Sequence, residues 1–288
     1  YHTVYLKSDG TVWAAGSNNY GKLGDGTTID RSNPVQVVDS GGNALSDVHA
    51  VAAGFYHTVY LKTDGTIWTV GRNGGGQLGD GTTTDRINPV RVVDSGGSTF
   101  AGVSEIAAWD FHTVFLKSNG TVWATGKNSD GRLGDGTTID RSNPVQVVDS
   151  GGSPVTGVIG ISAGDLHTKY LKSDGNVWGT GNNSDGQLGD GTTTNRTNPV
   201  QVVDSGGAPI TEVSMVSAGG SHTVYLKADG TVWAAGNNGS GQLGDGTTTD
   251  RSNPVQVMNS ATNGEPFGQV SVKATSAGGD HTVYLTGE

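Results

Sequence analysis

The sequence predicts an all-β fold, a β-propeller of four-stranded blades, from three observations. A unit of about 55 residues recurs along the 288-residue chain, each copy contains four short segments with strand-like alternation, and helical periodicity is absent. Four short strands repeated at a fixed interval are typical of propellers. We therefore expect a single domain over residues 1–288, with five full copies of the repeat and a partial sixth.

Two landmarks define the repeat. The dipeptide His-Thr recurs at a spacing of 55 residues four times and then 59, at His2, His57, His112, His167, His222 and His281. The motif Leu-Gly-Asp-Gly-Thr-Thr begins at Leu23, Leu78, Leu133, Leu188 and Leu243. Residues 11–42 and 121–152 differ at only five of 32 positions, which indicates recent duplication or consensus engineering.

Each copy contains four strand candidates, which in the second copy are 48–53, 57–62, 66–70 and 89–93. Between the second and third candidates, Asp64-Gly65 predicts a tight hairpin. Pro89 has no N–H to donate, so the fourth strand is expected at a sheet edge. The second strand carries bulky side chains on both faces, as a blade packed between two neighbours requires.

The strand count leaves the number of blades open. The second strand occurs six times and each other strand five times, 21 in all, whereas five blades need 20. The first blade lacks its first strand, and residues 270–277 supply a copy near the other end of the chain. Pairing of the two would close the ring and remove an exposed sheet edge. We expect five circularly closed blades, with six blades, the last incomplete, as the alternative.

The order of motifs within the repeat carries a family resemblance. Asp-Gly-Thr-Val-Trp-Ala-x-Gly-x-Asn is followed by Gly-Gln-Leu-Gly-Asp-Gly-Thr-Thr, then Pro-Val-x-Val, then Ala-Ala-Gly-x-x-His-Thr. This pattern resembles the regulator-of-chromosome-condensation (RCC1-like) repeat over essentially the whole chain. The resemblance implies four-stranded blades around a central channel. Members usually have seven blades, so five copies depart from the family pattern.

Composition excludes several classes of partner and site. The formal net charge is −10 without any run of Lys or Arg, which argues against nucleic acid. The absence of Cys excludes disulfides, thiolate metal sites and cysteine nucleophiles. No apolar stretch approaches the roughly 18 residues that span a bilayer, so membrane insertion is not expected. The acidic, Gly/Asn/Thr-rich composition favours a bacterial extracellular or cell-surface protein.

The repeated polar residues are interpreted as structural. Asp25 and its equivalents either supply calcium ligands or cap their own glycine turn, and the turn is favoured. The repeated histidines either form a metal ring or hydrogen-bond within or between blades, and the hydrogen bond is favoured. The repeated tryptophans are predicted to lie in the blade core, and the repeated arginines to pair with nearby Asp. We expect neither metal nor cofactor.

Catalysis is not predicted. Ser, His and Asp are abundant, but they occur in symmetric copies, whereas a catalytic triad needs one exposed nucleophile beside an oriented base. Without helices there is also no phosphate-binding Gly loop that leads into a helix.

Positions that differ between copies are free to carry specificity. The turn before each His-Thr joins the first and second strands of a blade, so these turns should converge on one end of the propeller. This turn is aromatic in two neighbouring copies, and exposed aromatic side chains are typical interface anchors. Packing at the channel mouth is the alternative. The predicted partner-binding residues are Phe55, Tyr56, Trp109, Asp110, Phe111, Asp165 and Leu166.

These observations favour a non-enzymatic protein-binding scaffold. Plant UV-B photoreceptors of the resembling family carry Gly-Trp-Arg-His-Thr at this turn, whereas Trp109 to Thr113 here lack the Arg. A structural or engineered symmetric propeller, or a segment of a larger bacterial surface protein, is the main alternative. A guanine-nucleotide exchange factor is the lesser one, because the uniform repeats leave no room for an inserted wedge. A protein is the expected partner, and a glycan the alternative.

Overall fold

The computed structural model describes residues 2–259, 265–266 and 272–286. They form two compact units, each described here by itself. The first unit comprises Tyr1–Ser129 and Ile139–Gln146, and the second comprises Asp130–Thr138 and Val147–Glu288. No helix in the described ranges is long and apolar enough to cross a membrane.

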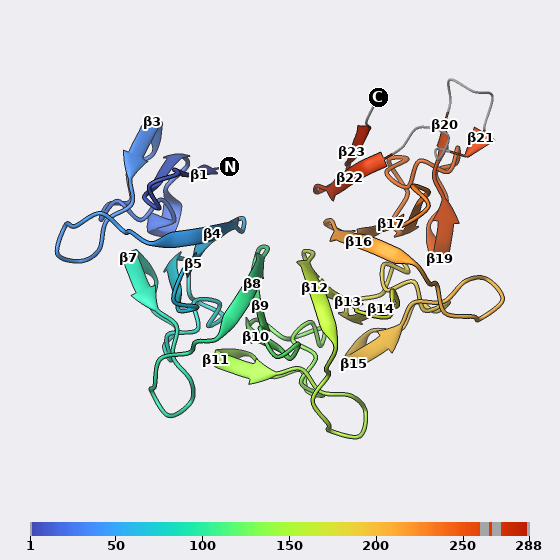
Figure 1. Cartoon of the computed structure of the whole chain (residues 1–288), viewed down its shortest axis with the longest axis horizontal. Helices are drawn as coiled ribbons and strands as arrows, with labels where there is room; N and C mark the ends of the chain where they lie inside the picture. Colours follow the sequence, from blue (N-terminus) through green and yellow to red (C-terminus); the bar gives the residue numbers. More distant parts are fainter. Residues whose placement is uncertain (1, 260–264, 267–271, 287–288) are drawn as a thin grey trace. The chain divides into compact units, whose positions relative to one another are not determined.

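The first unit contains three antiparallel sheets whose strands follow one another in sequence order (Figure 1). The three-stranded sheet has β1 (His2–Leu6), β2 (Val12–Gly16) and β3 (Arg31–Gln36), with a short 3-10 helix η1 (Asn19–Gly21) between the last two. The next sheet has β4 (Val48–Ala53), β5 (His57–Lys62), β6 (Ile67–Gly71) and β7 (Arg86–Arg91). The last has β8 (Val103–Ala108), β9 (His112–Lys117), β10 (Val122–Gly126) and β11 (Arg141–Gln146).

The second unit repeats this pattern in two four-stranded sheets. One has β12 (Val158–Ala163), β13 (His167–Lys172), β14 (Val177–Gly181) and β15 (Arg196–Gln201). The other has β16 (Val213–Ala218), β17 (His222–Lys227), β18 (Val232–Gly236) and β19 (Arg251–Gln256). Two short pairs follow, β20 (Met258–Asn259) with β21 (Glu265–Pro266) and β22 (Val272–Ala277) with β23 (Thr282–Thr286).

The predicted four-stranded blade is confirmed, with one correction to its last strand. Pro89 lies in the edge strand β7, as expected. However, β7 begins at Arg86 and ends at Arg91, rather than covering 89–93. It begins earlier because Arg86 pairs with Gly71 beyond an irregularity in the β6–β7 register. In this hairpin turn Gly65 adopts a φ of 76°, a left-handed conformation that favours glycine.

The circular closure that was expected does not appear in the strand pairing. Strand β22 pairs with β23 in a separate two-stranded sheet, and the sheet of β1 remains three-stranded. Residues 270 and 271 of the predicted closing segment lie outside the described residues. The pairing therefore corresponds to the alternative of an incomplete sixth blade.

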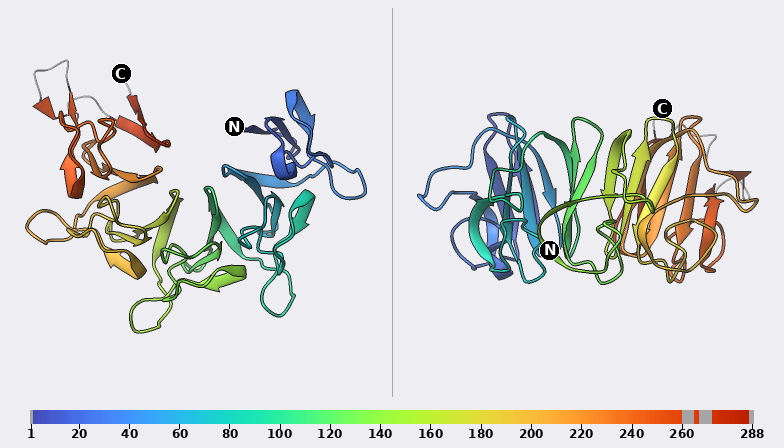
Figure 2. Two further views of the ribbon diagram at one scale, coloured as in Figure 1. Left: turned by 180° about the vertical axis from the view of Figure 1, so that it is seen from behind. Right: turned by 90° about the horizontal axis from the view of Figure 1, so that it is seen from below.

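The core of each unit lies between adjacent sheets. The burial pattern of β5 confirms that both faces of the second strand are covered, since every residue from His57 to Leu61 is buried. On one side, Val59 and Leu61 pack with Phe115 of the next sheet. On the other side, Tyr60 packs with residues of the preceding repeat, including Leu23 and Val37. Figure 2 shows the neighbouring sheets of each unit from behind and from below.

The repeated histidines link successive blades, as the structural interpretation predicted. Nε2 of His57 lies 2.8 Å from Oγ1 of Thr113 in the following repeat. The same contact joins His2 to Thr58, His167 to Thr223, and His222 to Thr282, at 2.9 to 3.0 Å. Burial lowers the pKa of His57 to about 3, so this imidazole is neutral at physiological pH.

The Leu-Gly-Asp-Gly-Thr-Thr turn is organised by its own aspartate. Oδ1 of Asp80 accepts hydrogen bonds from the backbone N–H and the hydroxyl of Thr82, and Oδ2 accepts one from Nε of Arg86. The predicted Arg–Asp pair thus forms here, and also in the other repeats at Arg31–Asp25, Arg196–Asp190 and Arg251–Asp245. The carboxylate oxygens are engaged by the turn itself, in accordance with the capping interpretation.

The repeated tryptophans are only half-buried, which corrects their prediction as blade core. Each ring lies beside the edge strand of its sheet, and the Lys that ends the second strand extends its ammonium group over the ring. The distances from Nζ to the ring centroid range from 5.0 to 6.0 Å, for Lys7–Trp13, Lys62–Trp68, Lys117–Trp123, Lys172–Trp178 and Lys227–Trp233. An aliphatic Lys stem with a solvated head suits this partly exposed place.

Candidate interaction site

Three aromatic rings from different repeats of the first unit surround Tyr56. The Tyr56 ring centroid lies 4.5 Å from that of Phe55, in the same β4–β5 turn, and 5.5 Å from that of Phe111, in the β8–β9 turn. Tyr20 of η1 makes an edge contact with Tyr56 at 5.8 Å. All four side chains are partly exposed, and Tyr20 retains 39% of its accessible surface.

The guanidinium group of Arg72 lies at the centre of these rings. Its Cζ is 5.0 Å from the ring centroid of Tyr56, 5.2 Å from that of Tyr20 and 5.3 Å from that of Phe111. Contacts within about 6 Å of a ring face are attractive because the ring quadrupole stabilises the cation. Arg72 has no carboxylate partner in the described part of the chain, in contrast to the arginines of the Asp-capped turns.

Two lysines flank the same rings. Nζ of Lys127 is 5.6 Å from the Phe111 centroid. Nζ of Lys22 is 6.0 Å from the Tyr56 centroid and donates to the backbone carbonyl of Phe55 at 3.2 Å. Burial lowers the pKa of Lys22, although Asp30 opposes this effect. We refer to Tyr20, Lys22, Phe55, Tyr56, Arg72, Phe111 and Lys127 as the aromatic–cation cluster.

Backbone geometry holds the cluster in place. Tyr20 adopts a φ of 68°, a left-handed conformation that is unusual for a residue other than glycine. Gly54 packs so closely against the next turn that a Cβ there would lie 2.3 Å from the Trp109 carbonyl oxygen. Only glycine allows this approach, so Gly54 sets the distance between the turns that carry Tyr56 and Phe111.

The structure divides the seven predicted binding residues between the units. Phe55, Tyr56 and Phe111 meet in the cluster, and Trp109 and Asp110 lie half-buried in the Phe111 turn. Asp165 and Leu166 occupy the corresponding turn of the second unit, where Nη1 of Arg132 donates to the Asp165 carbonyl at 3.2 Å. That arginine is 2% exposed and also pairs with Asp130 at 2.7 Å.

Sequence reasoning did not assign to the site the four cluster residues that come from the turn after the third strand. Tyr20, Lys22, Arg72 and Lys127 all belong to the turn after the third strand, which reads as a polar Gly/Asn turn. The available signal was a break in symmetry, because the position after the last glycine of that strand changes along the chain. It is occupied by Ser17, Arg72, Lys127, Asn182 and Asn237.

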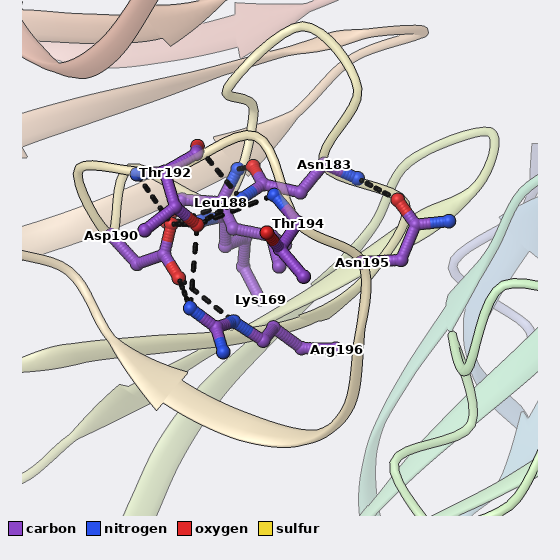
Figure 3. A network of polar contacts seen from close by, with 8 residues as sticks. All are labelled: Lys169, Asn183, Leu188, Asp190, Thr192, Thr194, Asn195 and Arg196. Atoms are coloured by element: carbon purple, nitrogen blue, oxygen red, sulfur yellow. Dashed lines mark hydrogen bonds and ion pairs between the residues drawn. The ribbon is translucent and has the colours of Figure 1, made fainter.

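A second break in symmetry is buried in the second unit. Lys169 replaces the valine found at this position in the other full copies, and it is fully buried. Its Nζ donates to the Leu188 carbonyl at 2.6 Å and lies 3.2 Å from the Tyr225 hydroxyl. Figure 3 shows Lys169 beneath the Asp190–Arg196 turn. Burial lowers the pKa of Lys169 to about 7, and the charge of Asp190 opposes this effect.

A metal centre is not assembled by the described residues. Across 2–259, 265–266 and 272–286, no three His, Asp or Glu side chains are placed to hold an ion. The aromatic–cation cluster presents partly exposed aromatic rings beside an arginine, the residue types enriched in protein-binding surfaces.

Comparison with known families matches the repeats along the chain. The model of the "Regulator of chromosome condensation (RCC1) repeat" matches residues 9–61, 64–116, 119–171, 174–226 and 229–285. Among curated proteins, the chain is 33% identical to the ultraviolet-B receptor UVR8 of Arabidopsis thaliana over 253 residues. That alignment covers 88% of this chain and 55% of UVR8, so the chain spans about half the length of this relative.

Solved structures show the same fold. Human WBSCR16 superimposes with a TM-score of 0.81 at 22% identity, covering 99% of this chain and 69% of that one. Yeast RCC1 (Prp20), solved bound to Kap60, superimposes with a TM-score of 0.77 at 20% identity, covering 99% and 65%. These relatives are eukaryotic, so the expectation of a bacterial protein finds no support among them.

Proposed function

Since the chain belongs to the RCC1 repeat family, we propose that it is a non-enzymatic scaffold whose aromatic–cation cluster binds a protein partner. The position of Arg72 carries this proposal. A guanidinium group held among three partly exposed rings presents apolar area and charge together, and Trp, Tyr and Arg are the residues enriched at binding hot spots.

Two further observations support a binding role over pure packing. The cluster residues vary between copies, whereas the packing residues of the blades repeat. In addition, Tyr20 holds a left-handed conformation, and unusual backbone conformations cluster at functional sites. A related fold in yeast, RCC1 (Prp20), was solved bound to the protein Kap60, which makes a protein ligand a reasonable expectation here.

The test uses substitutions that the repeat itself provides. Tyr56→Ser, Phe111→Ser and Arg72→Asn introduce residues found at equivalent positions of the fifth repeat, Ser221 and Asn237. The matched control is Ile29→Thr, a change at an exposed side chain outside the cluster, where other repeats carry Thr. A random peptide display library is panned against the native protein, and the enriched peptides are titrated against each folded variant.

We expect peptides that bind the native and Ile29→Thr proteins equally and the triple variant at least about tenfold more weakly, since loss of one hot-spot side chain costs about 2 kcal/mol. If no peptide is enriched, or if the triple variant retains full affinity, the cluster is packing. The chain would then be better described as a structural repeat, the main alternative from the sequence. Exchange of guanine nucleotides, the lesser alternative, is measured separately on a small GTPase.

A further inference from the structure

Asn119 breaks the symmetry of the hairpin that joins the second and third strands of each sheet. In the other four copies this turn begins with an acidic residue followed by glycine. These acidic residues are Asp9, Asp64, Asp174 and Asp229. In the third repeat the turn between β9 and β10 instead contains Asn119-Gly120, and Asn119 is exposed. Glycine has no Cβ to shield its backbone nitrogen, so the Asn119 side chain lies next to an unhindered nucleophile.

The side-chain oxygen of Asn119 accepts two hydrogen bonds. The backbone N–H of Thr121 donates to Oδ1 at 3.1 Å, and the Thr121 hydroxyl donates at 2.7 Å. Two donors on this oxygen withdraw electron density from Cγ, and they stabilise the negative charge that develops on Oδ1 when a nucleophile adds to Cγ. The pair of donors therefore acts on the side-chain amide as an oxyanion hole acts on an acyl group.

The nucleophile is the backbone nitrogen of Gly120. Its N–H donates to the Lys117 carbonyl at 2.8 Å, the bond that closes the turn. This bond must open before the nitrogen can attack, so the folded hairpin reacts more slowly than an unstructured peptide of the same sequence. The turn is exposed and lies at the end of the hairpin, where one bond can open while β9 and β10 stay paired.

A carboxylate in place of the amide fits this turn, because the other copies already contain one. Oδ1 of Asp64 accepts bonds from the Thr66 N–H at 2.9 Å and the Thr66 hydroxyl at 2.6 Å, the same two contacts that Asn119 makes. These bonds lower the pKa of Asp64, so they stabilise its charged form. Within the described residues Nδ2 of Asn119 donates no hydrogen bond, so its loss breaks no contact of the turn.

We propose that Asn119 is a site of spontaneous deamidation, through which the third repeat acquires the acidic residue of the other copies. The Gly120 nitrogen gives its proton to a base in solvent and bonds to Cγ of Asn119. The Cγ–Nδ2 bond breaks, and Nδ2 takes a proton from water and leaves as ammonia, which produces a cyclic succinimide. Water then adds to one imide carbonyl, the ring opens and its nitrogen regains a proton. The product is aspartate or isoaspartate.

Two other Asn-Gly pairs provide controls inside the same chain. Asn73 and Asn238 each precede a glycine, and both are fully buried. Nδ2 of Asn73 donates to Asp80 Oδ1 and to the Thr82 carbonyl, both at 3.0 Å, and Asn238 makes the equivalent bonds. Departure of either Nδ2 as ammonia would break these contacts, so both should stay intact. A further pair, Asn263-Gly264, lies outside the described residues.

The matched variants use the second repeat as a copy of the site. Asp64→Asn places Asn-Gly before Thr66, which supplies the same two donors. The Gly65 N–H closes that turn to the Lys62 carbonyl at 2.9 Å, so the protection of the nucleophile is also the same. Thr121→Val removes the hydroxyl donor from Asn119 and keeps the backbone donor. Each protein is aged at pH 7 and pH 9, and peptide mapping by mass spectrometry reads every Asn-Gly pair separately.

We expect Asn119 to convert in the folded native protein, faster at pH 9, while Asn73 and Asn238 stay intact. The Asp64→Asn protein should gain a second site of similar rate. Thr121→Val should slow conversion of Asn119 about fivefold, as expected for loss of one hydrogen bond in the transition state. An intact Asn119 under conditions that convert the unstructured peptide, or conversion of Asn73 and Asn238 at the same rate, would overturn the proposal.

The Asn119→Asp protein tests the fit of the product independently of the reaction. It should unfold at the same temperature as the native protein, since the other copies carry Asp in this turn. A lower unfolding temperature would contradict the fit. Failure of this proposal would leave the proposed binding function untouched, because the hairpin and Phe111 lie at opposite ends of β9.

Discussion

Nε2 of His57 lies 2.8 Å from the hydroxyl of Thr113 in the next repeat, and that hydroxyl donates to the Gln77 carbonyl at 2.7 Å. The Thr113 side chain therefore connects three segments of the first unit while remaining fully buried. We expect Thr113→Val to destabilise the protein by about 1–3 kcal/mol, because two buried polar groups lose their partner. Urea denaturation measures this loss.

Thr83→Val is the matched control, since Thr83 is exposed and lies in a turn. It should change the free energy of unfolding by less than about 0.5 kcal/mol. Equal stability of the two variants would show that the histidine link contributes nothing to the packing of the blades.

Acid should destabilise the protein through its buried histidines. Burial lowers the pKa of His57 to about 3 and those of His2 and His222 to about 4, against 6.5 for an exposed histidine. As the pH falls below 6.5, the unfolded chain binds protons that the folded chain excludes, so the free energy of unfolding decreases. Stability curves between pH 7 and pH 4 should show this decline, and a His57→Gln variant should show a shallower one.

Lys169 should extend the same trend to alkaline pH. Its pKa is about 7 in the folded protein and 10.5 in the unfolded chain. Between these values folding releases a proton, so stability increases as the pH rises, by up to about 1.4 kcal/mol per pH unit. Below pH 7 the lysine is charged in both states and the penalty is constant. In the Lys169→Met protein, the increase in stability with pH should disappear. Its free energy of unfolding at neutral pH should be higher than that of the native protein.

Lys169 and Gly179 should be energetically coupled. The third strand carries Gly179 where other repeats have Ala or Thr, and a Cβ there would lie 2.9 Å from Nζ of Lys169. Gly179→Ala should therefore destabilise the native protein but stabilise the Lys169→Val protein, in which it fills space. A double-mutant cycle by thermal melting measures the coupling, and additive effects would contradict it.

Tyr20→Gly should separate stability from binding. Its φ of 68° suits glycine, so the substitution relieves strain while removing one ring from Arg72. We expect the free energy of unfolding of the variant to equal or exceed that of the native protein. Library-selected peptides should bind the variant more weakly. Unchanged binding would indicate that Tyr20 only shields the cluster.

The sequence by itself determined the repeat, the four-stranded blade and the roles of the repeated histidines, aspartates and arginines, but not the partial exposure of the repeated tryptophans. These features follow from local patterns that recur in every copy, such as the alternation in His57–Lys62 and the Asp-capped turn, so each copy confirms the others. The aromatic half of the cluster was also predictable, because Phe55, Tyr56 and Phe111 interrupt an otherwise regular turn.

Only the tertiary structure decided which variable residues meet. Arg72 contacts Tyr20 and Phe111, which lie 52 and 39 residues away in other repeats, because neighbouring sheets bring different turns together. A periodic sequence specifies the repeated unit, whereas contacts between non-equivalent positions depend on how the units stack.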